Sequence, residues 1–179
     1  MIGVLVSGDG TNLQAILDAG LPVGAVASSR GDARALERAR ATSVPAAAFE
    51  LDEFESREER DLAMADWLEA HGVTLVACAG YMYLLTPAFL ARFPQRIVNV
   101  HPALLPAFPG KTPIEDALAS GAAETGVTVH WVDEGVDSGP IIAQERVTIA
   151  GDDTAALLRE RLQAVEHRLY PEVLRELSQ

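Results

Sequence analysis

Ile-Gly-Val-Leu-Val-Ser-Gly-Asp-Gly-Thr-Asn, residues 2–12, is an apolar run that stops at two closely spaced glycines. A short continuous apolar run is typical of a buried parallel strand, and the glycines indicate a turn behind it. Residues 12–19 then favour a helix. The chain is therefore expected to open with a strand, a turn and a helix, the arrangement that begins many α/β folds.

Strands and helices alternate in the rest of the sequence. Strands are predicted at 23–28, 44–49, 73–79, 96–100, 126–132 and 140–149, and helices at 33–41, 56–72, 87–93, 113–120 and 153–177. This alternation predicts an α/β fold with an open, mostly parallel sheet, helices on both faces and a ligand crevice at the carboxyl ends of the strands. The last two strands predict an antiparallel C-terminal portion, followed by a long closing helix. Residues 1–179 are expected to form a single domain.

The composition excludes several classes of partner. Of the 179 residues 49% are hydrophobic, and no apolar run approaches the ~20 residues of a membrane-spanning helix. The formal net charge of −12 opposes nucleic acid and anionic membranes, because binding to phosphate backbones requires clustered Lys and Arg. The first residues lack the basic region and cleavage site of a signal peptide, which favours a cytoplasmic location. Cys78, the single cysteine, lies in an apolar run and is expected to be an inert buried residue.

The turn at Gly8–Asn12 is suited to holding a phosphate. Its glycines can take positive φ and let a ligand approach the backbone, while the free N–H groups and the dipole of a helix N-terminus favour an anion. The side chains of Thr11 and Asn12 add donors. A dinucleotide fits poorly because Leu13 fills the third glycine position of the fingerprint, and the Gly-Lys-Ser/Thr of a P-loop does not follow. A plain turn without a ligand is the alternative.

Polar side chains gather near the ends of later strands. Asn99 and His101 lie two residues apart at a strand end, so both side chains point to one side of the backbone. An Asn amide can donate to a developing oxyanion, and His can donate or move a proton near neutral pH. In the acidic turn at 133–140, Asp137 is expected to point inward and keep a histidine protonated. His130, in mid-strand, is interpreted as a packed histidine, and no residue spacing indicates a metal site.

Four segments resemble the phosphoribosylglycinamide formyltransferases, a family of folate-dependent formyltransferases. They are Ser-Gly-Asp-Gly-Thr-Asn-Leu-Gln-Ala at 7–15, Ala-Gly-Tyr-Met at 79–82, Asn-Val-His-Pro-Ala-Leu-Leu-Pro at 99–106, and Gly-Val-Thr-Val-His-Trp-Val-Asp-Glu-Gly-Val-Asp-Ser-Gly-Pro-Ile at 126–141. The resemblance runs in order over nearly the whole chain. It implies a Rossmann-like formyltransferase fold and a place in purine synthesis. The implied reaction moves the formyl group of 10-formyltetrahydrofolate to the amine of glycinamide ribonucleotide, giving N-formylglycinamide ribonucleotide and tetrahydrofolate.

The resemblance also implies roles for individual residues. Asn99, His101 and Asp137 match the family's catalytic trio, in which the first two stabilise an oxyanion and the third relays a proton. The ribonucleotide would bind at Gly8, Asp9, Gly10, Thr11, Asn12 and Glu166, the last of these through the ribose hydroxyls. The folate pocket maps onto Arg57, Met82, Tyr83, Leu84, Leu85, Leu90, Val132, Asp133, Glu134, Gly135 and Val136. A monomer or homodimer is expected, with no metal, nucleic acid or membrane as a partner.

Three alternatives stand beside this interpretation. A formyltetrahydrofolate deformylase resembles a longer chain with an N-terminal regulatory domain, whereas the first strand here is predicted from Ile2. A methionyl-tRNA formyltransferase carries a C-terminal RNA-binding domain, which is not expected in a chain that ends at Gln179. A phosphate or folate sensor would not need the polar trio. Two positions depart from the family pattern, since members often have Arg in place of Tyr83 and commonly have His within the stretch that is Lys111–Ile114 here.

Overall fold

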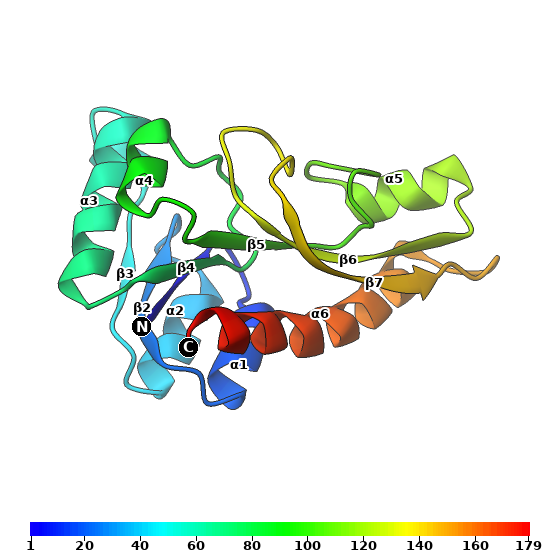
Figure 1. Cartoon of the computed structure of the whole chain (residues 1–179), viewed down its shortest axis with the longest axis horizontal. Helices are drawn as coiled ribbons and strands as arrows, with labels where there is room; N and C mark the ends of the chain where they lie inside the picture. Colours follow the sequence, from blue (N-terminus) through cyan, green and yellow to red (C-terminus); the bar gives the residue numbers. More distant parts are fainter.

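The central strands are short apolar segments that are buried on both faces. The computed structural model describes residues Met1–Gln179 and contains one seven-stranded sheet, in the order β3-β2-β1-β4-β5-β6-β7 (Figure 1). Every residue of the first two strands is buried, which explains their continuous apolar sequence. The strands are β1 (Ile2–Val6), β2 (Val23–Ser28), β3 (Ala46–Ala48), β4 (Leu75–Cys78), β5 (Ile97–His101), β6 (Glu124–Trp131) and β7 (Ile141–Thr148).

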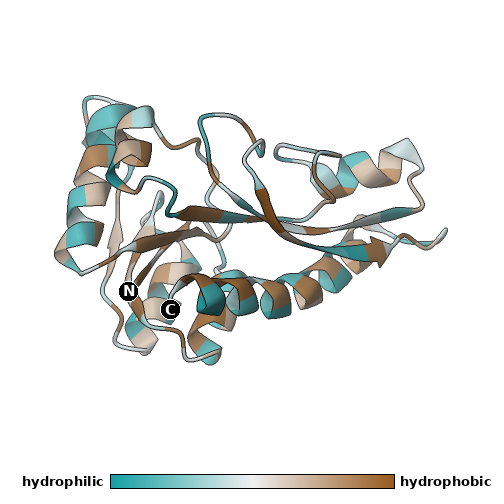
Figure 2. Cartoon of the chain, in the orientation of Figure 1, coloured by the Kyte–Doolittle hydropathy of each residue, from teal (hydrophilic) through white to brown (hydrophobic).

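Helices cover both faces of this sheet, as the sequence predicted. Figure 1 shows α3 and α4 over one face, and α1, α2 and α6 over the other. Their apolar sides build two cores, so that the central strands are mostly brown in Figure 2 while the helices alternate between brown and teal. None of the helices has both the length and the apolar character needed to cross a membrane. The helices are α1 (Thr11–Asp18), α2 (Arg34–Ala41), the 3-10 helix η1 (Leu51–Glu53), α3 (Arg57–Ala70), α4 (Pro87–Arg92), α5 (Pro113–Ser120) and α6 (Ala155–Leu177).

The strand order reverses next to β1. This strand pairs in parallel with β2 on one side and with β4 on the other. In open α/β sheets a ligand crevice forms at such a reversal, outside the carboxyl ends of the strands. The turn after β1 and the segment after β4 therefore flank the crevice. Beyond it, β5, β6 and β7 pair antiparallel, which confirms the predicted C-terminal portion.

One strand is shorter than predicted, and a side chain caps the start of α3. The strand expected at 44–49 is only Ala46–Ala48, because the Val44 N–H donates to the Ala39 carbonyl and closes the end of α2 instead. At the start of α3 the Ser56 hydroxyl accepts from the Glu59 N–H at 3.1 Å, as a capping box requires. The Glu59 carboxylate, however, accepts from the N–H of Glu55, one residue before the reciprocal partner of that motif.

The hydroxyl of Tyr170 links the closing helix to the centre of the sheet. Tyr170 lies in α6 and is fully buried. Its Oη lies 3.0 Å from the carbonyl oxygen of Cys78 in β4 and 3.0 Å from that of Val98 in β5. Burial raises the pKa of this phenol well above its ordinary value, so the hydroxyl keeps its proton and donates. The helix is therefore attached to the two strands whose ends border the crevice.

Tyr170→Phe is expected to lower the free energy of unfolding by about 1–2 kcal/mol, because two buried carbonyls lose a donor while the packing is kept. Urea denaturation measures this loss. Tyr83→Phe is the matched control, since the Tyr83 side chain is 41% exposed, and it should stay within about 0.5 kcal/mol of the wild type. Equal stabilities of the two variants would mean that the Tyr170 hydrogen bonds contribute nothing to the fold.

Candidate active site

A cavity of about 920 Å³ lies at the carboxyl ends of the central strands. The turn after β1 forms one part of its wall, the segment after β4 another, and the turn between β6 and β7 a third. Its volume lies in the range of pockets that bury a drug-sized ligand. Most of the residues singled out in the sequence line it: Gly8, Asp9, Gly10, Thr11, Asn12, Arg57, Met82, Tyr83, Leu84, Leu85, Asn99, His101, Val132, Asp133, Gly135, Val136, Asp137 and Glu166.

Two of the predicted folate-pocket residues do not line the cavity. Leu90, in α4, packs against the apolar core beneath the cavity wall. Glu134 is exposed in the turn between β6 and β7. Its neighbour Asp133 has a local function there, because its Oδ1 accepts from the Gly135 N–H at 3.0 Å and from the Ser138 hydroxyl at 2.8 Å. The carboxylate of Asp133 therefore shapes the turn.

The turn after β1 needs its two glycines for different reasons. Gly10 has φ +70°, and a Cβ placed there would lie 2.6 Å from the Ala35 Cβ of α2. Close packing against α2, rather than approach of a ligand, thus excludes a side chain at this position. Gly8 does not have positive φ, contrary to expectation, and a Cβ there would meet no protein atom within 4 Å. Because Gly8 lines the cavity, a side chain at Gly8 would occupy ligand space.

Arg38 supports this turn from behind. Its Nε donates to the Asp9 carbonyl at 2.7 Å, and its Nη1 donates to the Gln14 side chain at 3.0 Å. The guanidinium therefore fixes the turn and places a positive charge beside the N-terminus of α1. Both features favour an anion at the first N–H groups of the helix.

Glu166 reaches the same end of the cavity from α6. Its Oε2 accepts from the Asn12 amide at 2.9 Å, and the residue is 7% exposed. Burial raises the pKa of this carboxyl group, and the hydrogen bond from Asn12 and the charge of Arg159 only partly oppose the rise. The other amide atom, Asn12 Oδ1, is buried without a partner. This pair consequently has unused capacity for hydrogen bonds with hydroxyl groups.

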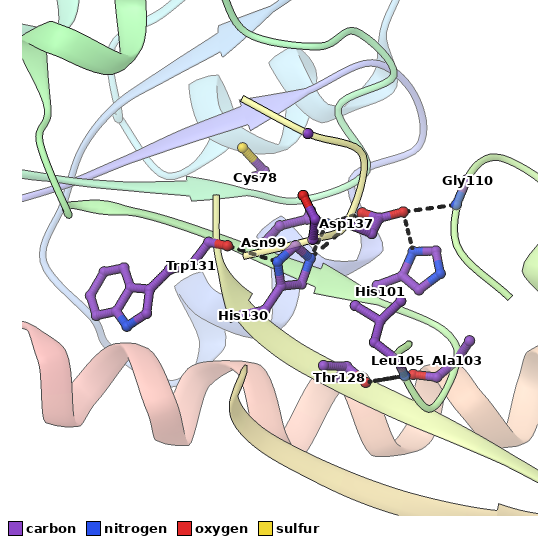
Figure 3. Close-up of polar contacts among 12 residues, drawn as sticks. Cys78, Asn99, His101, Ala103, Leu105, Gly110, Thr128, His130, Trp131 and Asp137 are labelled. Carbon is purple, nitrogen blue, oxygen red and sulfur yellow. Dashed lines mark hydrogen bonds and ion pairs between the residues drawn. The ribbon is translucent and has the colours of Figure 1, made fainter. Parts of the chain in front are cut away.

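Asn99, His101, His130 and Asp137 lie close together (Figure 3), and all four line the cavity. The Asn99 amide nitrogen lies 3.4 Å from Asp137 Oδ1 and 3.2 Å from His130 Nε2. His101 Nδ1 lies 3.4 Å from Asp137 Oδ2. The pleat of β5 places Asn99 and His101 on one side of the strand, and the register of β6 places His130 opposite Asn99.

The hydrogen bonds of the two histidines differ. His130 Nδ1 faces the Trp131 carbonyl oxygen at 2.8 Å, and its Nε2 faces both the Asn99 amide nitrogen at 3.2 Å and Asp137 Oδ1 at 3.6 Å. His101 Nε2 faces the Phe108 carbonyl oxygen at 2.8 Å, while its Nδ1 faces Asp137. Both nitrogens of His101 thus face oxygen atoms that accept hydrogen bonds, whereas Nε2 of His130 also faces an amide nitrogen.

Asp137 is held as an anion by the groups around it. Partial burial acts to raise the pKa of its carboxyl group, but the hydrogen bond with His130, the Gly110 N–H and the charges of the two histidines outweigh burial. The pKa therefore lies below its ordinary value of 3.8. The Gly110 N–H donates to Oδ2 at 2.8 Å. The backbone has φ 50° here, a left-handed conformation that Asp and Asn tolerate better than most residues.

The loop after His101 is fixed at its start by β6 and β7. The buried Thr128 hydroxyl donates to the Ala103 carbonyl at 2.6 Å and accepts from the Leu105 N–H at 3.1 Å. Gln144 donates to the Leu105 carbonyl at 2.8 Å. These bonds orient residues 103–105 just beyond His101, so the strand hairpin positions the loop that carries Phe108 and Gly110.

The sequence analysis missed His130 as a residue of this cluster. It is buried, as expected of a packed histidine, but it also contacts Asn99 and lines the cavity. The contact depends on the register of β6 against β5, which a pattern of residue types does not give. Other lining residues that were not assigned to the site include Tyr81, Gln163 and Arg159. Cys78 also lines the cavity, and burial raises the pKa of its thiol to about 12, so it stays protonated at neutral pH.

Asp137→Asn should cost about 1–2 kcal/mol of stability at pH 7, because Asn fits the backbone and the site but carries no charge. The pKa of Asp137 is lower in the folded than in the unfolded chain, so its ionised form stabilises the fold. This stabilisation is complete above the unfolded pKa near 3.8 and is lost as the pH falls through the folded pKa. The difference in free energy of unfolding between wild type and variant should therefore become smaller below about pH 4. Urea denaturation at several pH values measures it, with Glu134→Gln as the control. A gap that does not change with pH would contradict the assignment.

Known proteins are similar to this chain over almost all of its length. A family model described as "Formyl transferase" matches residues 1–174. The phosphoribosylglycinamide formyltransferase of Bacillus subtilis (strain 168) is 38% identical over 182 residues, which cover 97% of this chain and 92% of that protein. A trifunctional purine biosynthetic protein adenosine-3 from Chironomus tentans is 40% identical, but the match covers only 13% of its length.

A solved structure shows that the similarity extends to the whole fold. The phosphoribosylglycinamide formyltransferase of Streptococcus pneumoniae TIGR4 superposes with a TM-score of 0.96 at 47% sequence identity, over 99% of this chain and 98% of that one. Since the family model and the relatives both span almost all of the chain, the chain belongs to the formyl transferase family.

Proposed function

We propose that this chain transfers the formyl group of 10-formyltetrahydrofolate to the amine of glycinamide ribonucleotide, giving N-formylglycinamide ribonucleotide and tetrahydrofolate in purine synthesis. One observation carries the proposal. Asn99, His101 and Asp137 line the same cavity as a turn suited to phosphate and a run of exposed apolar side chains. The printed names of the full-length relatives support the choice of substrates.

The acceptor is proposed to bind at the end formed by β1, α1 and α6. Backbone N–H groups of the turn at Gly8–Asn12 would hold the phosphate, with Arg38 adding positive charge behind it. Glu166 and Asn12 would bind the ribose hydroxyls, because the partnerless Oδ1 of Asn12 and the buried carboxyl group can both hydrogen bond with them. Binding here offsets part of the cost of burying Glu166.

The donor is proposed to bind at the opposite end. Met82, Tyr83 and Leu84 are 48%, 41% and 50% exposed, an unusual run for apolar side chains on a free surface. With residues 132–136 they offer flat apolar walls and backbone hydrogen bonds, which suit a pterin ring. Arg57 donates to the Leu84 carbonyl and places a cation at the cavity edge, suited to the carboxylates of a folate. Leu90 then acts by supporting this wall from the core.

The chemistry follows from charge development at the formyl oxygen. When the acceptor amine adds to the formyl carbon, a new C–N bond forms and negative charge grows on the oxygen. The Asn99 amide and the His101 ring donate hydrogen bonds to that oxygen. His101 Nε2 must first release the Phe108 carbonyl, which it contacts at 2.8 Å. Asp137 keeps His101 protonated and accepts the proton that leaves the amine, directly or through one water, before the C–N bond to the donor breaks and the donor nitrogen is protonated.

We also propose that residues 1–179 act as one domain, as a monomer or homodimer in the cytoplasm. Both apolar cores share the same sheet, so neither half of the chain has a core of its own. Cys78 is free and buried, so folding does not require an oxidising compartment.

Product formation should depend on the acceptor. Purified protein is incubated with 10-formyltetrahydrofolate, with and without glycinamide ribonucleotide, and both free formate and formylated product are quantified. Turnover should be very slow without the ribonucleotide. The dephosphorylated acceptor should bind far more weakly than glycinamide ribonucleotide, because the turn at Gly8–Asn12 loses its anion. Rapid formate release that ignores the ribonucleotide would instead identify a hydrolase.

Asn99→Ala and His101→Ala should each lower kcat by at least about 100-fold, because their donors matter most as charge develops on the formyl oxygen. Steady-state kinetics measures kcat, and calorimetry should show that substrate binding persists. His71→Ala, at the C-terminus of α3 and outside the cavity, is the control for loss of a histidine. Turnover close to wild type in either variant would remove that residue from the mechanism.

A further inference from the structure

Helix α3 contains an ion pair that is almost completely buried. The Arg60 and Asp61 side chains are 1% and 0% exposed. Arg60 donates to Asp61 Oδ1 from Nε at 3.0 Å and from Nη2 at 2.7 Å. Taking two charges out of water is costly, and an apolar pair would often be as stable in this place. The pair therefore calls for an explanation other than stability.

Both members of the pair contact the segment that follows β4. Asp61 Oδ2 accepts from the Thr86 N–H at 2.8 Å. The Arg60 guanidinium lies over the ring of Tyr83, 4.9 Å from its centroid, which is cation–π geometry. One carboxylate and one guanidinium thus hold two points of the segment, on either side of Leu84 and Leu85.

The conformation of the segment Tyr81–Thr86 depends on contacts with other elements. The segment contains no helix or strand, so its backbone groups need partners from elsewhere. At its start the Met82 N–H donates to the Ser7 hydroxyl at 3.0 Å, and at its end the Thr86 N–H donates to Asp61. Met82, Tyr83 and Leu84, in the middle of the segment, are about half exposed, so burial alone does not fix their side chains.

We propose that Arg60 and Asp61 are positioning residues that hold the Tyr81–Thr86 segment in the shape that binds the formyl donor. This inference rests on the proposed function, in which Met82, Tyr83 and Leu84 form the wall for the donor's ring. The planar fork of Arg60 binds Asp61 with two donors while its face meets Tyr83, and Asp61 keeps a second oxygen for Thr86. An apolar pair would leave the Thr86 N–H without its acceptor and Tyr83 without its cation.

Arg60→Lys tests the proposal because it keeps the charge and removes the planar fork. The expected result is a rise of about tenfold in KM for 10-formyltetrahydrofolate, with kcat within about twofold and KM for the acceptor unchanged. Amide hydrogen exchange at residues 82–86 should accelerate by a similar factor. Asp61→Asn, which keeps the size of the side chain, should show the same pattern and serves as a second variant.

Arg92→Lys is the matched control. Arg92 lies in α4 and pairs with Asp66 and Glu69 of α3, so it joins the same helix to a neighbour without contacting residues 81–86. It should leave KM for the donor and exchange at 82–86 unchanged. The proposal is overturned if Arg60→Lys and Asp61→Asn only lower the melting temperature, or if exchange at 82–86 rises as much in Arg92→Lys.

The exchange measurement separates this inference from the proposed function. Binding of 10-formyltetrahydrofolate to the wild type is measured by calorimetry alongside it. If the wild type does not bind this donor, the proposed function fails, whereas the exchange rates still report whether Arg60 and Asp61 position the segment. If the wild type binds and both variants bind equally well with unchanged exchange, the positioning inference alone fails.

Discussion

The carboxylate of Asp137 orders the centre of the site. It contacts Asn99 and His101 of β5, His130 of β6 and the N–H of Gly110, so one anion connects two strands and a loop. Neither the left-handed backbone nor the partial burial of a charge is favourable by itself. Both are tolerated because four polar groups surround the two carboxylate oxygens: the Asn99 amide, the Gly110 N–H, His101 Nδ1 and His130 Nε2. Under the proposed mechanism, the fixed carboxylate of Asp137 also orients the His101 ring, because Oδ2 lies 3.4 Å from Nδ1.

An acidic chain can bind anionic substrates because binding depends on local rather than net charge. The formal charge of −12 is a sum over the whole chain, whereas the turn after β1 offers backbone N–H groups at a helix start, with Arg38 bonded to the same turn. Such groups are already oriented and need no side chain to be ordered on binding. The cost falls on Glu166, whose burial raises the pKa of its carboxyl group in the free protein. Under the proposed function, the ribose hydroxyls would hydrogen bond with this carboxyl group and offset part of the cost of burying it.

The fold and the position of the candidate site could be predicted from the sequence, whereas several contacts between residues within the site could not. Apolar runs ending in glycine or polar residues located the strands, and strand alternation was enough to put Asn99 and His101 on one side of β5. His130 was not recognised as a neighbour of Asn99 because that contact depends on the register of β6 against β5, which a pattern of residue types does not fix. Likewise the requirement for glycine at Gly10 comes from Ala35 of a separate helix. Contacts of this kind join segments distant in sequence and become visible only in the folded chain.

The two ends of the cavity depend on opposite faces of the sheet. The turn at Gly8–Asn12 packs on α2, and Glu166 comes from α6, both on the face covered by α1, α2 and α6. The segment Tyr81–Thr86 contacts Arg60 and Asp61 of α3, on the other face. The Tyr170 hydroxyl of α6 contacts the carbonyls of Cys78 in β4 and Val98 in β5, so the helix that carries Glu166 is also bonded to the strands beside the polar cluster. Under the proposed function, the acceptor and the donor would therefore be supported by helices on different faces of the sheet.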